Sequence, residues 1–334
     1  MQLPVGVGKN GSVTSLRLVF AGTPSVAVPS LERLVASGHE VVGVVTRPDA
    51  PLGRKRVLTP SPVAAAAERL GIPVIKAARL DADATAEVEA LRPDLGVVVA
   101  YGGLVREPLL SLPRHGWINL HFSLLPAWRG AAPVQHAIIA GDELAGASVF
   151  RLVPELDAGD VFAMLSRPAD PTATAGETLE ALAVEGAGLL ADVVDAIRDG
   201  SAVATAQTGE PTFAPKLAID DARLDWSRPA REVLARSRGV TPEPGAWTTI
   251  DGERLKVLEV REALTSDVSG AGDSADATDA PLLAPGEVRP ERRRVLVGTA
   301  DRAIELVRVQ PAGKGAMTAA DWGRGLGDRA VVLV

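Results

Sequence analysis

Short apolar runs alternate with segments of helical pattern through the first part of the chain. Residues 16–20 are followed by a tight turn, a helix over about 25–37 and a valine-rich strand at 40–46. Residues 95–100 are apolar apart from one glycine, as expected of a strand buried on both faces. A strand–turn–helix–strand succession opens an α/β sheet with right-handed crossovers. The sequence therefore predicts a doubly wound, mostly parallel, Rossmann-like sheet.

The same pattern continues to about residue 199, which we take as the end of the first domain, 16–199. Further strands are expected at 116–121, 147–153 and 161–165, and a long helix at 178–198. The first turn holds one glycine rather than the G-x-G-x-x-G of dinucleotide-binding proteins, and no Walker A loop is present. These absences disfavour NAD and ATP as ligands.

The second half of the chain changes character. Residues 200–221 are small and polar with two prolines, which is typical of a linker. Short strands separated by turns then predict a smaller OB-like β-barrel over 222–334. Residues 265–280 combine small residues with four aspartates and are expected to be a disordered loop, and 1–15 a flexible N-terminal extension.

Composition excludes several kinds of site. The chain has no cysteine, so disulfides, iron–sulfur clusters and thiol nucleophiles are ruled out. No histidine has a second ligand at metal-binding spacing, so we expect no metal. The formal net charge is −7, and a nucleic-acid partner would have to bind local basic patches at 47–56 or 289–294. With no membrane span or targeting segment in the pattern, we expect a cytoplasmic protein.

Asn119 and His121 form the candidate site in the first domain. They lie two residues apart near the end of an expected strand, so their side chains leave the same face. Ligands of doubly wound sheets bind outside the carboxyl ends of the strands, where these two residues lie. The alternative interpretation is a strand end with an ordinary hydrogen-bonded amide and imidazole.

A carboxylate is expected to join them from the polar loop at 154–160. Asp157 and Asp160 lie on either side of the Ala158-Gly159 pair, and chemistry alone does not choose between them.

Several motifs resemble the 10-formyltetrahydrofolate-dependent formyltransferases. N-x-H-x-S-L-L-P begins at Asn119, and L-D-A-G places Asp157 thirty-six residues after His121. The resemblance implies that Asn119, His121 and Asp157 are catalytic, with an amine attacking the formyl carbon through a tetrahedral oxyanion that the amide and a protonated imidazole stabilise. It also implies 10-formyltetrahydrofolate as co-substrate, held by four residues: Ser123, Leu124, Leu125 and Pro126.

Other segments are similar to the members that formylate methionyl-initiator tRNA. They are LVFAGTP at 18–24, PSPV at 60–63, RGAAPVQHAI at 129–138, LDW at 224–226, PGAWT at 244–248 and VQPAGKGAM at 309–317. The resemblance implies a tRNA partner met by a basic loop containing Arg54, Lys55 and Arg56, and we expect a monomer. Residues 236–244 match the family pattern only loosely, and the loop 265–280 is an insertion.

Two alternative functions remain open at this point. The first is a formyltransferase acting on a sugar nucleotide or another small amine. The second is a non-catalytic RNA-binding or folate-sensing protein.

Overall fold

A computed structural model describes residues 15–53, 55–263, 283–327 and 329–334. The predicted extension, except for residue 15, lies outside the described residues, as do Arg54 and the predicted disordered loop at 265–280. Contacts divide the chain into two units. The first unit holds residues 1–129, 146–166 and 180–212, and the second holds 130–145, 167–179 and 213–334.

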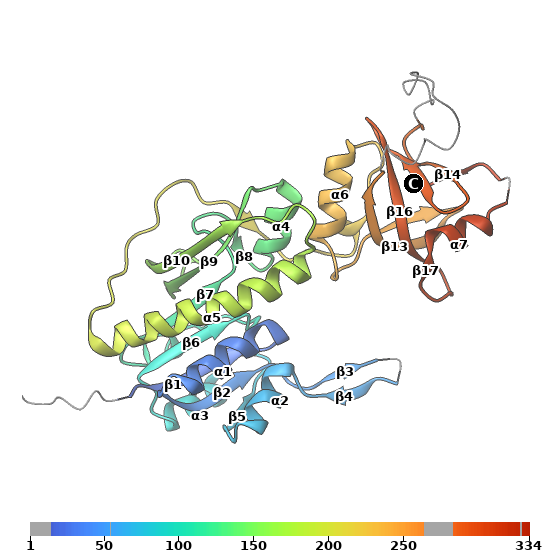
Figure 1. Ribbon diagram of the computed structural model, residues 1–334. Coiled ribbons are helices and arrows are strands. Elements are labelled where there is room, and N and C mark those ends of the chain that lie inside the picture. The colour runs from blue at the N-terminus through green and yellow to red at the C-terminus, as the bar shows by residue number, and fades with distance from the viewer. Residues whose placement is uncertain (1–14, 54, 264–282, 328) are drawn as a thin grey trace, which may run out of the picture. The chain divides into compact units, whose positions relative to one another are not determined.

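The first unit is built on a seven-stranded sheet with the order β10-β9-β7-β6-β1-β2-β5 (Figure 1). Pairs β1-β2, β2-β5, β1-β6 and β6-β7 are parallel, whereas β9 runs antiparallel to β7. The predicted mostly parallel sheet is confirmed. Its strands are β1 Arg17–Gly22, β2 Glu40–Thr46, β5 Val74–Lys76, β6 Leu95–Val99, β7 Trp117–His121, β9 Leu144–Arg151 and β10 Val161–Pro168.

Helices connect these strands and start at the residues that local chemistry favours. Ser61 caps α2, where its side chain accepts a hydrogen bond from the Ala64 amide and a proline follows in the first turn. Asp81 caps α3 by accepting a hydrogen bond from the Ala84 amide. Figure 1 shows α5 lying across the strands of the sheet. The helices are α1 Val28–Ala36, α2 Pro62–Arg69, α3 Ala82–Ala90 and α5 Ala175–Asp199, with 3₁₀ turns η1 Ser25–Ala27 and η2 Leu109–Ser111. Helix α4 Pro133–Ala140 and the first residues of α5 fall in the second unit.

Large buried side chains fix β7 inside this sheet. Trp117 is fully buried, and its indole N–H donates to the Leu109 carbonyl at 2.8 Å. Gly96 on the neighbouring strand lies against the ring, where a Cβ would be 2.1 Å from an indole carbon. The start of β7 is therefore held rigidly by packing, which fixes the position of the candidate site residues at its end.

The segment expected as a loop at 47–60 contains a β-hairpin. Strand β3 Ala50–Leu52 pairs antiparallel with β4 Val57–Thr59. Both Gly53 and Arg56 have positive φ, and the Arg56 amide donates to the Gly53 carbonyl at 3.1 Å, which closes the turn. Sequence pattern missed the strands because their apolar residues are exposed rather than buried.

The second unit contains the predicted antiparallel barrel. Its sheet has the order β12-β13-β16-β15-β14-β18, with β17 paired to β16. Thr249 and Val334 exchange two backbone hydrogen bonds of 2.9 and 3.0 Å, which brings the chain end beside β12 and nearly closes the barrel. Its strands are β12 Trp247–Ile250, β13 Glu253–Glu262, β14 Glu287–Pro290, β15 Val295–Gly298, β16 Ala303–Pro311, β17 Met317–Thr318 and β18 Val331–Val332.

One core joins this barrel to its helix α6. Val233 of α6 is buried in the same cluster as Leu255 of β13 and Leu306 of β16, and Figure 1 shows α6 beside the barrel strands. The helical elements here are α6 Ala230–Gly239, α7 Ala319–Arg324 and η3 Asp220–Ala222. A separate two-stranded sheet consists of β8 Arg129–Gly130 and β11 Phe213–Ala214.

The predicted linker at 200–221 is divided between the units after Thr212. Its first part is bound to the sheet domain, since Val161 and Thr205 exchange two backbone hydrogen bonds of 2.8 and 2.9 Å. The boundaries 16–199, 200–221 and 222–334 stay a prediction.

Candidate active site

Strand β7 delivers the first two site residues. Asn119 lies opposite Phe150 of β9, and His121 lies opposite Ser148 at the strand's end. The imidazole is 7% exposed and meets the ring of Phe150 edge-on, with 6.2 Å between ring centroids. Edge-on packing is one of the favourable arrangements for a pair of aromatic rings.

Asp157 arrives from the loop after β9. Its Oδ2 lies 3.9 Å from Nδ1 of His121, and its side chain is 12% exposed. Its φ is +47°, an uncommon backbone conformation for aspartate. At Gly159 the loop approaches β9 so closely that a Cβ would lie 1.8 Å from the Arg151 carbonyl oxygen. Only glycine can occupy this position without moving the loop. Asp160 is exposed, so the structure brings Asp157 to the imidazole.

Burial governs the charge of His121. Desolvation lowers the pKa of His121 from 6.5, while the Asp157 carboxylate and the Trp128 carbonyl both act to raise it. Nε2 lies 2.9 Å from the Trp128 carbonyl oxygen, which can only accept a hydrogen bond. In the neutral imidazole, Nε2 therefore carries the hydrogen and Nδ1 presents its lone pair toward Asp157.

Asn119 has an unsatisfied polar atom. Its Oδ1 is buried and has no hydrogen-bond partner among the described residues. A buried polar atom left unpaired costs on the order of 1–3 kcal/mol. The amide therefore holds hydrogen-bonding capacity that a ligand could use.

A cavity of about 350 Å³ lies beside two of these residues, and His121 is not among the described residues that line it. Asn119 and Asp157 line it, together with residues from three segments: Val98 from the end of β6, the loop 103–107 with Leu110, and 152–156. Sequence reasoning did not assign the loop 103–107 to the site. The Gly102-Gly103 turn after β6 could have indicated it. Strands β6 and β7 are parallel neighbours, so their carboxyl ends lie at the same edge of the sheet, and the loop that follows β6 lies beside the end of β7.

The four residues expected to hold folate form a tight turn after β7. The Ser123 hydroxyl donates to the Ala127 carbonyl at 2.6 Å, and the Ser148 hydroxyl donates to the Ser123 carbonyl at 2.6 Å. Ser123 and Leu125 are buried, whereas Leu124 and Pro126 are half-buried. None of the four lines the 350 Å³ cavity as the described residues define it. Their assignment as folate contacts stays a prediction.

The basic loop residues are displayed on the hairpin. Lys55 and Arg56 are exposed, and Arg54 lies outside the described residues. The strands beside them expose large apolar side chains, with Leu52 at 66%, Val57 at 59% and Leu58 at 67%. The hairpin thus presents cations and apolar surface together.

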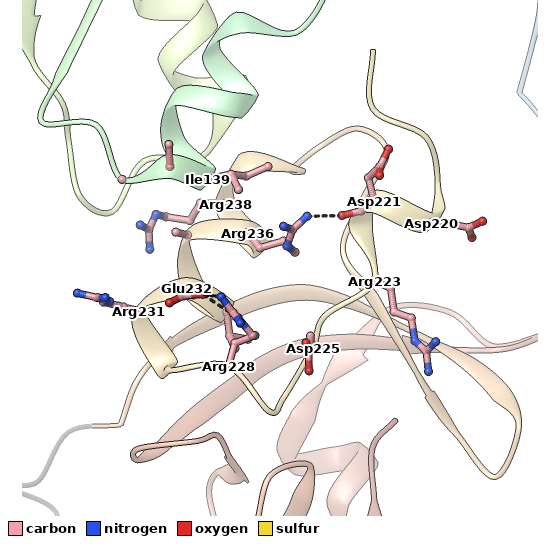
Figure 2. Close-up of a pocket in the computed structure, with 14 residues that line it drawn as sticks. Ile139, Asp220, Asp221, Arg223, Asp225, Arg228, Arg231, Glu232, Arg236 and Arg238 are labelled. Atoms are coloured by element: carbon pink, nitrogen blue, oxygen red, sulfur yellow. Dashed lines mark hydrogen bonds and ion pairs between the residues drawn. The ribbon is translucent and has the colours of Figure 1, made fainter. Parts of the chain in front are cut away.

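A larger cavity of about 890 Å³ lies within the second unit (Figure 2). Five arginines and four carboxylates line it, with Arg236 donating to the Asp221 carbonyl and Arg228 bonded to Glu232. The opposing charges nearly balance, so the cavity does not favour one class of ion. None of the residues predicted for the site belongs to it.

Two general findings concern the part of the chain that the structure describes. It contains no group of three or more histidine, cysteine or carboxylate side chains that could hold a metal ion. None of its helices is both long and apolar enough to cross a membrane.

Sequence comparisons match both halves of the chain. The sequence model described as "Formyl transferase" matches residues 16–194, and "Formyl transferase, C-terminal domain" matches 216–327. A methionyl-tRNA formyltransferase from Leifsonia xyli subsp. xyli (strain CTCB07) is 63% identical, over 95% of this chain and 100% of its own length. Another from Clavibacter sepedonicus is 61% identical, over 95% of this chain and 99% of its own.

Solved structures share the fold at lower identity. HypX from Aquifex aeolicus in complex with tetrahydrofolic acid aligns with a TM-score of 0.61 and 20% identity, over 94% of this chain and 47% of that one. The N-formyltransferase from Helicobacter canadensis in complex with folinic acid and dTDP-3-aminofucose aligns with a TM-score of 0.64 and 14% identity, over 89% of this chain and 99% of that one.

Proposed function

Because this chain belongs to the methionyl-tRNA formyltransferase family, we propose that Asn119, His121 and Asp157 carry its chemistry. The chain is an enzyme that transfers a formyl group to methionyl-initiator tRNA for translation initiation. The formyl donor is 10-formyltetrahydrofolate, and the acceptor is the free α-amino group of the methionyl residue. The observation that supports these roles most is that Asn119 and Asp157 line one cavity while Asp157 faces His121.

Formyl transfer requires one proton to leave the attacking nitrogen and negative charge to build on the formyl oxygen. The amine nitrogen bonds to the formyl carbon, and the bond from that carbon to the folate N10 breaks. The Asn119 amide can donate a hydrogen bond to the formyl oxygen as it becomes negative. A donor already held at that position stabilises the transition state more than the ground state.

His121 is suited to receive the amine proton. Burial lowers the pKa of the imidazole, so the neutral form dominates at neutral pH, and its Nδ1 lone pair is available. Protonation places a hydrogen on Nδ1 facing the Asp157 carboxylate, which stabilises the cation. The protonated imidazole then returns the proton to N10 as it leaves. This assignment starts the cycle with a neutral imidazole, whereas the sequence-based hypothesis used a protonated one.

We propose that the folate occupies the 350 Å³ cavity. Its wall combines apolar side chains with the Asn119 amide and the Asp157 carboxylate, a mixture typical of small-molecule sites. Leu124 and Pro126, which are half-buried in the turn after β7, remain the candidates for further contact within the segment from Ser123 to Pro126.

The hairpin is proposed to meet the tRNA. Lys55 and Arg56 can neutralise phosphates, as can Arg54, and the exposed apolar side chains beside them can pack on bases or sugars. A protein with a net charge of −7 needs such a local basic surface to bind a polyanion. We further propose that the enzyme acts as a monomer in the cytoplasm.

The sugar-nucleotide alternative rests on structures such as the Helicobacter canadensis enzyme, which share the fold at 14% identity. Relatives above 60% identity that match this chain over nearly its whole length favour the tRNA substrate. The same relatives, which are named as formyltransferases, disfavour a non-catalytic RNA-binding or folate-sensing protein.

One assay tests the function directly. The purified protein is incubated with 10-formyltetrahydrofolate and methionyl-initiator tRNA, and formylmethionine is measured after hydrolysis of the ester. Uncharged tRNA and a dTDP-amino sugar serve as acceptor controls. We expect formylation of the charged tRNA only. Formylation of the sugar without formylation of the tRNA would overturn the proposal.

A further inference from the structure

Residues 205–212, which we call the strap, pass beside both loops that face His121. Thr205 pairs with Val161 of β10. At the other end, Thr212 accepts a hydrogen bond from the Trp128 amide at 2.9 Å through its hydroxyl, and another from the Arg129 amide at 2.9 Å through its carbonyl. The composition of this segment predicts a linker, yet its contacts are those of an ordered part of the first unit.

Gln207 joins the two loops through a single side chain. Its Oε1 accepts hydrogen bonds from the Arg129 guanidinium, at 2.6 Å from Nη2 and 3.2 Å from Nε. Its Nε2 donates to the carbonyl oxygens of Asp157 at 2.8 Å and Gly159 at 2.9 Å. Every lone pair and hydrogen of the amide therefore has a partner, which fixes both its position and its orientation.

The groups that Gln207 holds are next to the partners of the imidazole. Arg129 follows Trp128, whose carbonyl oxygen contacts Nε2 of His121. Asp157 itself faces Nδ1. The residues Trp128 and Asp157 both have positive φ, at +62° and +47°, a backbone conformation that residues other than glycine seldom adopt. A strained backbone keeps its shape only where neighbouring contacts hold it.

We propose that Gln207 is a positioning residue for formyl transfer. It fixes the Asp157 loop and the Trp128–Arg129 turn at the spacing that the two ring nitrogens of His121 require. It does not touch the reacting atoms, and its effect reaches them through Asp157 and the Trp128 carbonyl. This proposal rests on the proposed function.

The test compares Gln207→Glu and Gln207→Ala with Thr208→Ala. The glutamate variant keeps the length of the side chain and the acceptor for Arg129, but it loses both donors and turns a carboxylate toward the Asp157 and Gly159 carbonyls. Thr208 is the exposed neighbour and serves as the matched control. Loss of such a supporting contact typically lowers activity about 10- to 100-fold. We expect that loss in kcat for both Gln207 variants, with KM for each substrate changed less than about threefold and with Thr208→Ala unaffected.

A second readout separates positioning from stability. The Asp157 carboxylate raises the pKa of His121, so a displaced Asp157 lets the imidazole titrate at a lower pH. The His121 resonance, followed by NMR in the full chain without substrate, should titrate lower in Gln207→Ala and be unchanged in Thr208→Ala. Gln207→Glu is compared by kcat alone, because its added carboxylate itself acts to raise the pKa of His121.

The outcomes are distinguishable. A wild-type kcat in Gln207→Glu overturns the positioning role. So does an unchanged His121 titration in folded Gln207→Ala together with activity that follows the folded fraction. If Gln207→Ala does not fold, Gln207→Glu decides by its kcat, corrected for the folded fraction. If the wild-type protein does not formylate methionyl-tRNA, the proposed function fails, while the His121 titration still decides whether Gln207 positions Asp157.

Discussion

The two ring nitrogens of His121 face groups of different kinds. The Trp128 carbonyl on one side can only accept a hydrogen bond, whereas the Asp157 carboxylate on the other side stabilises positive charge. This asymmetry fixes the neutral tautomer and still favours the cation once a proton arrives. A general base needs both properties, because it must be neutral before the transition state and charged after it.

The first prediction concerns the pH dependence of activity. Burial lowers the pKa of His121 below 6.5, and Asp157 raises it. If the neutral imidazole is the active form, kcat/KM falls as the pH drops through that lowered pKa. Asp157→Asn removes the raising influence, so its acid limb should move to still lower pH. A limb that moves upward would contradict the assignment of His121 as base.

The second prediction separates two neighbouring carboxylates. Asp157→Asn should lower kcat by about 100-fold or more, because Asp157 faces the imidazole. Asp160→Asn is the matched control, since Asp160 is exposed in the same loop and should keep activity within about twofold. Single-turnover rates measure both. Combining Asp157→Asn with Asn119→Ala should cost less than the product of the single effects, because the groups act as a unit. Equal losses at Asp157 and Asp160 would show that the loop as a whole matters.

The sequence was informative on this site where local rules operate. Alternation along a strand placed Asn119 and His121 on one face, because the period of two is a property of extended backbone. Asp157 was chosen over Asp160 by motif alone, since the difference lies in a loop conformation that depends on Gly159 and a positive φ. Gln207 gave no local signal, because its partners lie 48 to 78 residues away.

At the scale of elements, the hairpin shows where pattern reading fails. A buried strand is recognised by its apolar face, yet β3 and β4 expose their apolar side chains to solvent. The length of the segment and its cations indicated a functional loop. They did not indicate strands, because the pairing of β3 with β4 depends on a turn with positive φ at Gly53 and Arg56. An exposed apolar hairpin is typical of a surface that gains a partner.

The third prediction concerns this hairpin. Removing Lys55 and Arg56 together should weaken tRNA binding and flatten its dependence on salt, because each phosphate contact releases roughly 0.7 to 0.9 of a counterion. Folate affinity should not change. The double variant Arg33→Ala/Arg69→Ala removes the same charge from α1 and α2 and is the control. The measurement is log affinity against log salt concentration. Identical slopes in all three proteins would mean that the hairpin is ordinary solvated surface.

At the scale of the whole molecule, the order of elements along the chain predicted both folds, the mostly parallel sheet and the small barrel. It did not predict that residues 130–145 and 167–179 cluster with the second unit. Helix α4 shows why, because Ile139 packs against the core that contains Trp226 and Leu306. The sequence of α4 predicts a helix with one apolar face, but it does not predict which hydrophobic core that face packs against.

The fourth prediction concerns two fragments. A chain ending at Thr212 keeps the strap, whereas one ending at Gly200 loses it. Both lose the packing of Ile139, so their comparison isolates residues 201–212. The longer fragment should melt at higher temperature and bind 10-formyltetrahydrofolate more tightly, as measured by calorimetry. Neither should formylate methionyl-tRNA at the full rate, since both lack the barrel. Equal melting and equal affinity would contradict the ordered role of the strap.

The place of Gln207 in the chain also has a consequence in time. Asn119 and His121 are synthesised first, and Gln207 follows His121 after 86 further residues. At about 5–20 residues per second, roughly 4 to 17 s separate them on the ribosome. In the later part of that interval, once Asp157 has been added, the nascent chain carries its three proposed catalytic side chains without the amide proposed to hold their loops in register. An enzyme that prepares the initiator for translation thus gains this supporting contact only after its proposed catalytic residues have themselves been translated.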